Sequence, residues 1–147
     1  MSDICIISCG ARKVWKSDNS RKLVPAKDAY TGPLFKKCKE YAERFFPENW
    51  FIISDKYGLI RPDALISDYN ISPDAVKGNH QFVEYIARQK IQLGITASII
   101  TTTSGKIHQD ILNKAFPESS FQNPVAKLSQ GKRLQKLNQL LNDGRKL

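Results

Sequence analysis

Short apolar runs alternate along the chain with longer stretches in which apolar residues recur every three or four positions. The runs at residues 4–7, 50–54 and 98–103 are rich in β-branched or aromatic side chains and are too short for helices. Almost every position in the run 50–54 is apolar, as in a central strand that is covered on both faces. The pattern predicts strands at these three runs and a short edge strand at residues 121–125.

The longer stretches predict four amphipathic helices, because their apolar residues recur at helical spacing. The first begins with Thr31 as the cap and Pro33 at the first helical position, where a missing N–H group costs little. The others begin near Asn79, after Ser104 and after Gly131.

Two connecting segments lack this periodicity. Residues 14–28 are rich in Lys, Ser and Asp, and predict a long surface loop. Such a loop is either a mobile cover over a functional site or a plain insertion. Residues 61–74 contain two prolines and predict an irregular connection.

Strands that alternate with helices predict an α/β fold, here a three-layer sandwich with a mainly parallel central sheet of about four strands and helices on both faces. A chain of 147 residues fits a single domain, 1–147. In an open sheet of this kind the strand-to-helix loops meet at one edge, where ligands bind. We therefore look for function in the loops that follow the three strands.

Composition narrows the class of protein. The content of 41% apolar and 25% charged residues is typical of a globular domain. No apolar run approaches the roughly 20 residues of a membrane span, and the chain opens with a strand, so we expect a soluble cytoplasmic protein with no membrane partner. The three cysteines have no CxxC spacing and the two histidines stand alone, so we expect free thiols, no metal site and no cofactor.

The charge balance points to an anionic partner. There are 23 Lys and Arg residues against 14 Asp and Glu, which gives a formal net charge of +9. In a soluble domain this balance favours a nucleotide or a nucleic acid as the partner. The alternative is a well-solvated basic surface with no partner.

The first loop contains small residues followed by two cations. Ser8 and Gly10 allow backbone N–H groups to approach an anion, and Arg12 and Lys13 neutralise its charge. We therefore predict phosphate binding, although the spacing is neither that of an ATPase loop nor that of a dinucleotide fingerprint. Cys9 is expected to be exposed beside cations, which lowers a thiol pKa and favours a nucleophile. The alternative is a small residue chosen for packing.

The second loop combines a cation, an aromatic ring and a glycine. Lys56 is a candidate for phosphate binding and Tyr57 for stacking on a base, with Ser54 and Gly58 beside them. The alternative is a simple turn in which Gly58 supplies a positive φ. Asp68, in the irregular segment, is a candidate general acid or base.

The third loop places Ser104 and Lys106 at the start of a helix, where unpaired N–H groups favour a phosphate. Ser104 is otherwise an ordinary helix cap. His108 is assigned to packing or to the surface. Lys132 and Arg133 begin the last helix and are candidates for a nucleic-acid contact, or else are simply solvated.

Four blocks of the sequence resemble a small family of uncharacterised prokaryotic and phage domains. The blocks are Ser8-Cys9-Gly10, the segment 25–35 (PAKDAYTGPLF), the segment 54–60 (SDKYGLI) and the segment 131–134 (GKRL). The family is similar in turn to the YaaA peroxide-stress proteins and to domains that accompany nucleic-acid base-modification enzymes. Two positions depart from the family pattern: Ala11 stands where lysine is common, and Asp55 where alanine is usual.

The resemblance implies an α/β fold akin to nucleoside-processing or uracil-glycosylase-like sheets, and a connection to DNA modification, repair or nucleotide metabolism. Its second block adds Tyr30, Thr31 and Gly32 to the candidate ligand-binding residues.

The leading hypothesis is a nucleotide- or nucleic-acid-binding domain that cleaves or transfers at a glycosidic or phosphoester bond. In this hypothesis Asp28 or Asp68 is the acid or base, and Cys9 is a less favoured nucleophile. The alternatives are a non-catalytic DNA-binding module and a small interaction subunit whose charge only maintains solubility.

Overall fold

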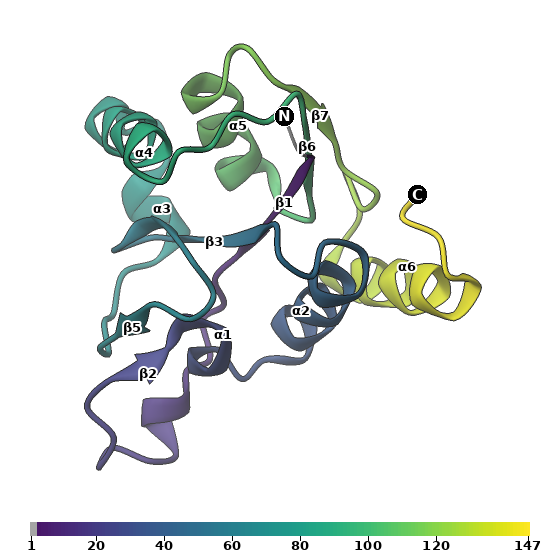
Figure 1. Cartoon of the computed structure of the whole chain (residues 1–147). Coiled ribbons are helices and arrows are strands. Elements are labelled where there is room, and N and C mark those ends of the chain that lie inside the picture. The colour runs from purple at the N-terminus through teal and green to yellow at the C-terminus, as the bar shows by residue number, and fades with distance from the viewer. Residues whose placement is uncertain (1–2) are drawn as a thin grey trace.

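The computed structural model describes residues 3–147 and has three layers, with a sheet between two groups of helices (Figure 1). The sheet has the strand order β4-β3-β1-β6-β7. Its strands are β1 (Ile4–Ser8), β3 (Trp50–Ser54), β4 (Gly58–Ile60), β6 (Ile99–Thr102) and β7 (Ser120–Gln122). Neighbouring strands run parallel, except that β4 is antiparallel to β3. The predicted α/β sandwich with a mainly parallel sheet is confirmed.

The central strand β1 divides the hydrophobic core in two, because successive side chains of a strand point to opposite faces. Ile4 and Ile6 belong to one buried cluster, whereas Cys5 and Ile7 belong to the other. A parallel strand lies on either side of β1 and a buried cluster covers each of its faces, so nearly all of its residues are buried. This explains the uninterrupted apolar run in the sequence.

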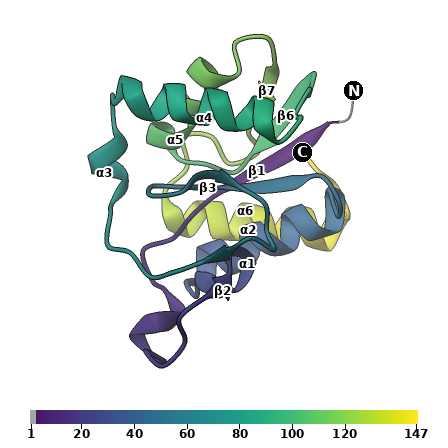
Figure 2. The same cartoon turned by 60° about the vertical axis from the view of Figure 1, so that its left-hand side comes forward.

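Helices pack on both faces of the sheet and contribute to the two cores (Figure 2). One face carries α3 (Pro73–Val76), α4 (His80–Gln92) and α5 (Lys106–Ala115). The other carries α1 (Ala26–Ala29), α2 (Pro33–Phe45) and α6 (Gln130–Asp143). The four predicted amphipathic helices are thus α2, α4, α5 and α6.

The helix starts confirm some of the predicted caps and correct others. The Asn79 side chain accepts a hydrogen bond from the Phe82 N–H at 3.1 Å and caps α4 as predicted. The prediction that Thr31 caps α2 is wrong, because Gly32 occupies the cap position and makes no side-chain hydrogen bond. Ser129 caps α6, so this helix already begins at Gln130, before Gly131.

The strand missing from the sequence prediction is β4, which follows β3 after a tight turn. Ser54 pairs with Gly58 across the hairpin, so Asp55, Lys56 and Tyr57 form the connection. Gly58 has a φ of +72°, a backbone conformation that glycine adopts at little cost. Only three residues long, β4 falls below the length at which a hydrophobic period is visible.

The two segments without periodicity contain more structure than predicted. Residues 14–28 are not one long loop: they hold a 3-10 turn, η1 (Val14–Lys16), with Trp15 buried, and a short strand, β2 (Val24–Pro25). Residues 61–74 include β5 (Leu65–Ile66), which pairs with β2 in an antiparallel two-stranded sheet. Local sequence does not reveal two-residue strands, because partners distant in the chain create them.

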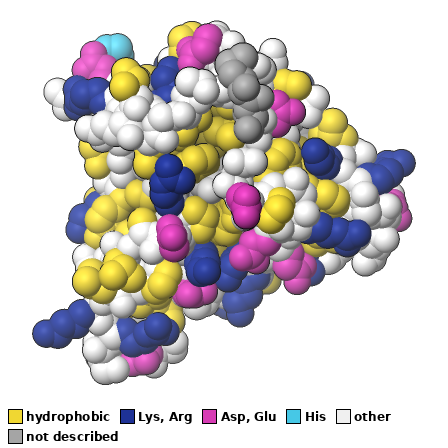
Figure 3. Space-filling model, in the orientation of Figure 1, with side chains coloured by type: hydrophobic (Ala, Val, Ile, Leu, Met, Phe, Trp, Pro, Cys, Tyr) yellow, Lys and Arg dark blue, Asp and Glu magenta, His cyan; other side chains and the backbone are white. Residues whose placement is uncertain are grey.

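Charges of both signs are distributed over the face seen in Figure 3, where Lys and Arg alternate with Asp and Glu between patches of hydrophobic side chains. Within residues 3–147, none of the helices combines the length and the apolar content that a bilayer crossing requires.

Candidate functional site at the carboxyl edge of the sheet

Polar side chains from three parallel strands meet at the carboxyl edge of the sheet. Ser8 ends β1 and is followed by Cys9, and Ser54 ends β3 and is followed by Asp55. Ser104 follows β6, and the first turn of α5 adds His108. Hydrogen bonds across 46 to 100 positions of sequence connect Ser8, Cys9, Asp55, Ser104 and His108.

A chain of three side chains forms the centre of the site. Nε2 of His108 lies 2.7 Å from Oδ1 of Asp55, and Nδ1 lies 2.7 Å from Oγ of Ser8. The Asp55 and His108 side chains are only 3% and 5% exposed, whereas Ser8 is half-buried. With its proton on Nε2 the His108 ring donates to the Asp55 carboxylate and offers Nδ1 as an acceptor for the Ser8 hydroxyl, and with the proton on Nδ1 it donates to Oγ of Ser8 instead.

Two more hydroxyl groups hold Ser8 in place. Oγ of Ser8 lies 2.8 Å from Oγ of Ser104, which lies 2.8 Å from Oγ1 of Thr102. The backbone N–H of Ser104 also donates to Oγ1 of Thr102, at 3.2 Å. Ser104 is therefore part of a buried hydroxyl relay. It is not the cap of α5, because Gly105 occupies that position.

Cys9 contacts the same carboxylate from the other side. Its Sγ lies 3.4 Å from Oδ2 of Asp55. Burial, and next the negative charge of Asp55, raise the pKa of the Cys9 thiol to about 12. The expectation that nearby cations lower this pKa is wrong, since the nearest charge is an anion and the thiol is desolvated. Cys9 is thus a neutral thiol at neutral pH and a poor nucleophile.

Two cations and two tyrosines border the cluster. Nζ of Lys13 lies 4.4 Å from the ring centre of Tyr69, and Nζ of Lys56 lies 5.1 Å from that of Tyr57. The two rings meet edge to face with their centres 5.7 Å apart. We refer to Lys13, Lys56, Tyr57 and Tyr69 as the cation–tyrosine group.

Hydroxyl contacts join the cation–tyrosine group to the strands. The Tyr69 hydroxyl lies 2.7 Å from the Tyr30 hydroxyl and accepts a hydrogen bond from Oγ of Ser54 at 3.1 Å. Burial, and next the proximity of Cys9, raise the pKa of Tyr69. Its hydroxyl therefore stays protonated and links the second loop to the segment that precedes α2.

The structure brings part of the predicted first site together. Lys13 forms an isolated β-bridge with Tyr30, and the Thr31 N–H donates to the Arg12 carbonyl at 3.0 Å. Gly32, the cap residue of α2, is half-buried and follows directly. Arg12 is exposed, and Gly10 packs near the Tyr30 side chain. The loop after β1 and the segment 30–32 thus lie side by side.

Other predicted residues have structural partners of their own. A side chain at Gly58 would collide with Gln89, whose amide bonds the Leu59 N–H and the Tyr57 carbonyl. Lys106 is exposed and pairs with Asp110 of its own helix at 3.2 Å. The turn interpretation of the second loop is therefore correct for Gly58, and the Lys106 ammonium is engaged within α5.

The two predicted catalytic carboxylates lie outside the buried cluster. Asp28 is exposed and its Oδ1 lies 3.4 Å from Nζ of Lys39. Asp68 is exposed and accepts a hydrogen bond from the N–H of Tyr69 at 2.8 Å. The carboxylate that the fold places at the centre is Asp55 instead.

The two cations predicted to contact nucleic acid, Lys132 and Arg133, lie in different surroundings. Lys132 is exposed on the first turn of α6. Arg133 is half-buried: its Nε donates to the Leu128 carbonyl at 2.9 Å, and its guanidinium group lies against Gly105. Arg133 therefore stands beside the amino end of α5, next to the carboxyl edge of the sheet.

Sequence reasoning missed the two central residues, Asp55 and His108. A usable signal existed for each. Asp55 directly follows a central strand, and His108 lies in the first turn of a helix that follows another strand. In a parallel sheet that turn is at the ligand-binding edge.

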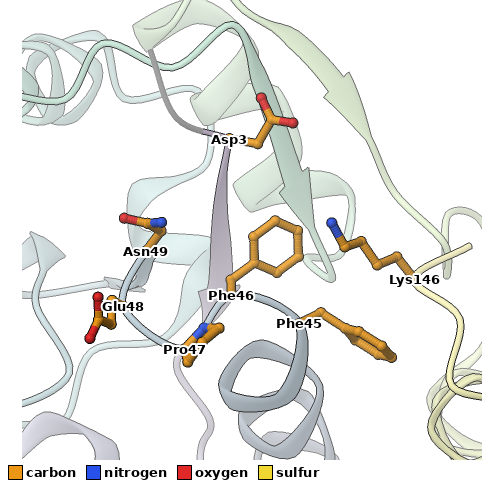
Figure 4. Close-up of a pocket in the computed structure, with 7 residues that line it drawn as sticks. All are labelled: Asp3, Phe45, Phe46, Pro47, Glu48, Asn49 and Lys146. Atoms are coloured by element: carbon orange, nitrogen blue, oxygen red, sulfur yellow. The ribbon is translucent and has the colours of Figure 1, made fainter.

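Two surface depressions lie away from this cluster. One, of about 340 Å³, is lined by residues at the amino edge of the sheet, including Asp3, Phe46 and Asn49 (Figure 4). The other, of about 280 Å³, is lined by residues that include Lys27, Trp50 and Asp63. Neither contains a residue of the buried cluster.

The cluster offers two kinds of chemistry. The Asp55–His108–Ser8 chain has the geometry for moving a proton to or from an oxygen atom. Alternatively, Cys9, Asp55 and His108 each offer one donor atom, and these atoms lie within 4.8 Å of one another. They are side chains of the kinds that hold transition metals.

Comparison with known proteins identifies the family. Residues 4–139 match DUF6884, a family of unknown function. The chain is 32% identical over 120 residues to the uncharacterized protein YfjM of Bacillus subtilis (strain 168), an alignment that covers 80% of this chain and 79% of YfjM. No solved structure matches the chain. With nearly its whole length matched, this chain belongs to the DUF6884 family.

Proposed function

We propose that the protein is an enzyme that binds a nucleotide, or a nucleotide within a nucleic acid, at the carboxyl edge of its sheet. The reaction is cleavage or transfer at a glycosidic or phosphoester bond. The observation that carries the proposal is the Ser8–His108–Asp55 chain, with both hydrogen bonds at 2.7 Å. A histidine held between a carboxylate and a hydroxyl is the arrangement that general acid–base catalysis uses.

In this proposal each member of the chain has one role. Asp55 holds the Nε2 proton and orients the ring. Nδ1 of His108 then takes the proton of Ser8, or of a water molecule beside it, as the new bond to oxygen forms. The imidazolium is stabilised by the carboxylate and returns the proton to the leaving group. This assigns to Ser8 the nucleophile role that the sequence suggested for Cys9, and to His108 the acid–base role that it suggested for Asp28 or Asp68.

The cation–tyrosine group supplies the binding surface. Lys13 and Lys56 flank a pair of tyrosines, so positive charge and aromatic surface occur together. Phosphate with a base or sugar has the complementary chemistry. The formal net charge of +9 favours an anionic ligand in the same way. The resemblance to YaaA proteins and to domains that accompany base-modification enzymes is a further reason to favour nucleic-acid chemistry.

Binding is tested with the double variant Lys13→Ala/Lys56→Ala. We expect it to lose affinity for mononucleotides and single-stranded DNA by at least about tenfold, because two charge contacts are removed. The control is Lys77→Ala/Lys114→Ala, which removes two exposed lysines elsewhere and keeps the net charge equal to that of the test variant. Calorimetry at two salt concentrations measures both. Equal affinity in the two variants would contradict the assigned surface.

Catalysis is tested separately with His108→Gln and Ser8→Ala. Screening of nucleosides, nucleotides and DNA should reveal a reaction that the wild type performs and that each variant slows by at least about 100-fold. A non-catalytic DNA-binding module predicts instead salt-sensitive binding of long DNA that neither substitution changes. That result would favour the module over the enzyme.

A further inference from the structure

Three potential metal ligands from distant parts of the chain converge at the carboxyl edge. Cys9 follows β1, Asp55 follows β3 and His108 lies on α5, and one donor atom from each lies within 4.8 Å of the others. Asp55 and His108 are buried and Cys9 is half-buried. We infer that these three side chains form a binding site for one Zn²⁺ ion.

The electrostatics of Asp55 favour a cation at this point. Its carboxylate is 3% exposed, and within residues 3–147 no Lys or Arg lies in ion-pair distance of it. A buried carboxylate without a balancing charge is costly. Bound Zn²⁺ supplies that charge directly, and the thiol and imidazole beside Asp55 are its preferred companions.

The distances suit tetrahedral coordination after small movements. Donor atoms about 2.1 Å from a tetrahedral ion lie roughly 3.4 Å from one another, and sulfur donors slightly farther. Sγ of Cys9 is already 3.4 Å from Oδ2 of Asp55. Nε2 of His108 is 2.7 Å from the other carboxylate oxygen, Oδ1, so a shared ion requires these two atoms to separate by less than about 1 Å and the carboxylate to turn one oxygen toward the ion. Three protein ligands leave the fourth position to a water molecule or a substrate atom.

A hydrogen bond behind His108 supports this role. Nδ1 lies 2.7 Å from Oγ of Ser8, which Ser104 holds in turn. With the histidine proton on Nδ1, the ring donates to Ser8 and presents the bare Nε2 to the ion. Such support by a second residue fixes the ring orientation of metal-binding histidines and strengthens the metal bond.

Binding must release a proton. Zn²⁺ binds a cysteine ligand as the thiolate, so the Cys9 thiol proton goes to solvent as Sγ takes the ion. In a neutral imidazole the proton moves from Nε2 to Nδ1, and none is lost there. We therefore expect at least one proton per Zn²⁺, measured by calorimetry in buffers of different ionisation enthalpy.

The metal-bound state and the proton-transfer state exclude each other, because Nε2 cannot hold both Zn²⁺ and the proton shared with Asp55. The inference itself rests on the ligand geometry and needs no substrate. Loss of nucleotide binding in the lysine variants would leave it standing, and absence of Zn²⁺ binding would leave the proposed function standing.

Metal-free full-length protein is titrated with Zn²⁺ against a chromophoric chelator, and with Co²⁺ in an absorption spectrometer. We expect one ion per chain and a thiolate-to-cobalt charge-transfer band. Cys9→Ser should abolish that band, and Cys9→Ser and His108→Gln should each weaken Zn²⁺ binding by more than about 100-fold. Ser8→Ala, which removes only the supporting hydroxyl, should weaken it about tenfold.

Matched controls are Cys38→Ala, a buried thiol in the core, and His80→Gln, an exposed histidine. Both should bind Zn²⁺ like the wild type. The inference is overturned if the wild type binds no stoichiometric Zn²⁺, or if Cys9→Ser retains wild-type affinity. Should His108→Gln fail to fold, the Cys9→Ser and Cys38→Ala pair decides, since each removes one thiol with little change in volume.

Discussion

At the scale of single residues, the surroundings of Asp55 set the chemistry of its neighbours. A desolvated carboxylate stabilises the protonated form of a thiol that it contacts, here the Cys9 thiol. The same loop sequence on a solvated surface would give Cys9 an ordinary thiol and His108 no fixed tautomer. Burial by the sheet and by α5 therefore turns common residue types into a buried, hydrogen-bonded cluster.

Thiol reactivity tests this environment. The pKa of Cys9 is about 12 and that of Cys38, raised mainly by burial, is about 11. At pH 8 we expect iodoacetamide to modify Cys9 of the folded protein at least about 100-fold more slowly than in the denatured chain, because little thiolate is present. Asp55→Asn should speed the reaction at Cys9 and leave Cys38 unchanged. Mass spectrometry measures both sites, and labelling of Cys9 at the denatured-chain rate would contradict the assignment.

The same pKa values predict how stability depends on pH. Folding favours the protonated thiol of Cys9, whose pKa rises from an ordinary 9.0 to about 12. Below pH 9 both states hold the proton, so stability is unaffected; above it the unfolded chain ionises first and stability falls until about pH 12. Denaturant unfolding between pH 8 and 10.5 should show this decline, and Cys9→Ser should make it shallower. An equal slope in the variant would show that Cys9 does not contribute.

At the scale of elements, the β3–β4 hairpin positions Asp55. Oγ of Ser54 accepts hydrogen bonds from the N–H groups of Lys56 and Tyr57, at 3.2 and 3.0 Å. Gln89 of α4 then bonds the far side of the turn. The turn is thus fixed from both sides, and Asp55 at its start is aimed toward the neighbouring strand β1.

Gly58 is the residue of this hairpin that tolerates substitution least. Gly58→Ala should cost about 1–3 kcal/mol through backbone strain at positive φ, and more from the collision with Gln89. Gly78→Ala measures the backbone strain alone, because Gly78 has a φ of +67° but open space where a side chain would lie. Gly131→Ala, in a helix and unobstructed, should instead stabilise by about 0.5–1 kcal/mol. Thermal unfolding ranks the three, and a neutral Gly58→Ala would contradict this account.

At the scale of the whole molecule, the sheet separates two cores that contribute independently. Ile86 of α4 and Leu137 of α6 are fully buried in different clusters on opposite faces. Because they belong to different clusters, these two residues share no packing partners. A cavity made on one face of the sheet therefore cannot be filled by side chains of the other face.

Additivity of two core substitutions tests this arrangement. Ile86→Val should cost about 0.5–1.5 kcal/mol and Leu137→Ala about 2–5 kcal/mol, from lost burial and residual cavities. The double variant should equal their sum to within about 0.5 kcal/mol. Denaturant titration of the three variants gives the comparison. A coupling energy well above that limit would mean that the faces are not mechanically separate.

The local pattern of apolar and polar residues is sufficient to predict the helices and strands that are long enough to show a period. The β-branched run at residues 50–54 and the helical spacing in α2, α4, α5 and α6 are set by side-chain period and by local caps, so they were predicted. The strands β2, β4 and β5 were not, because two or three residues carry no period and pair only when the chain folds back.

The amino-acid sequence by itself determined the α/β class, the placing of three polar loops at one edge of a parallel sheet, and the excess of positive charge. Only the tertiary structure decided which side chains meet there. It buried His108 and Asp55 in mutual contact, raised the pKa of Cys9, and left Asp28 and Asp68 exposed. The physical reason is that a pKa and a hydrogen-bond partner depend on desolvation and on neighbours up to 100 residues away, which local periodicity does not encode.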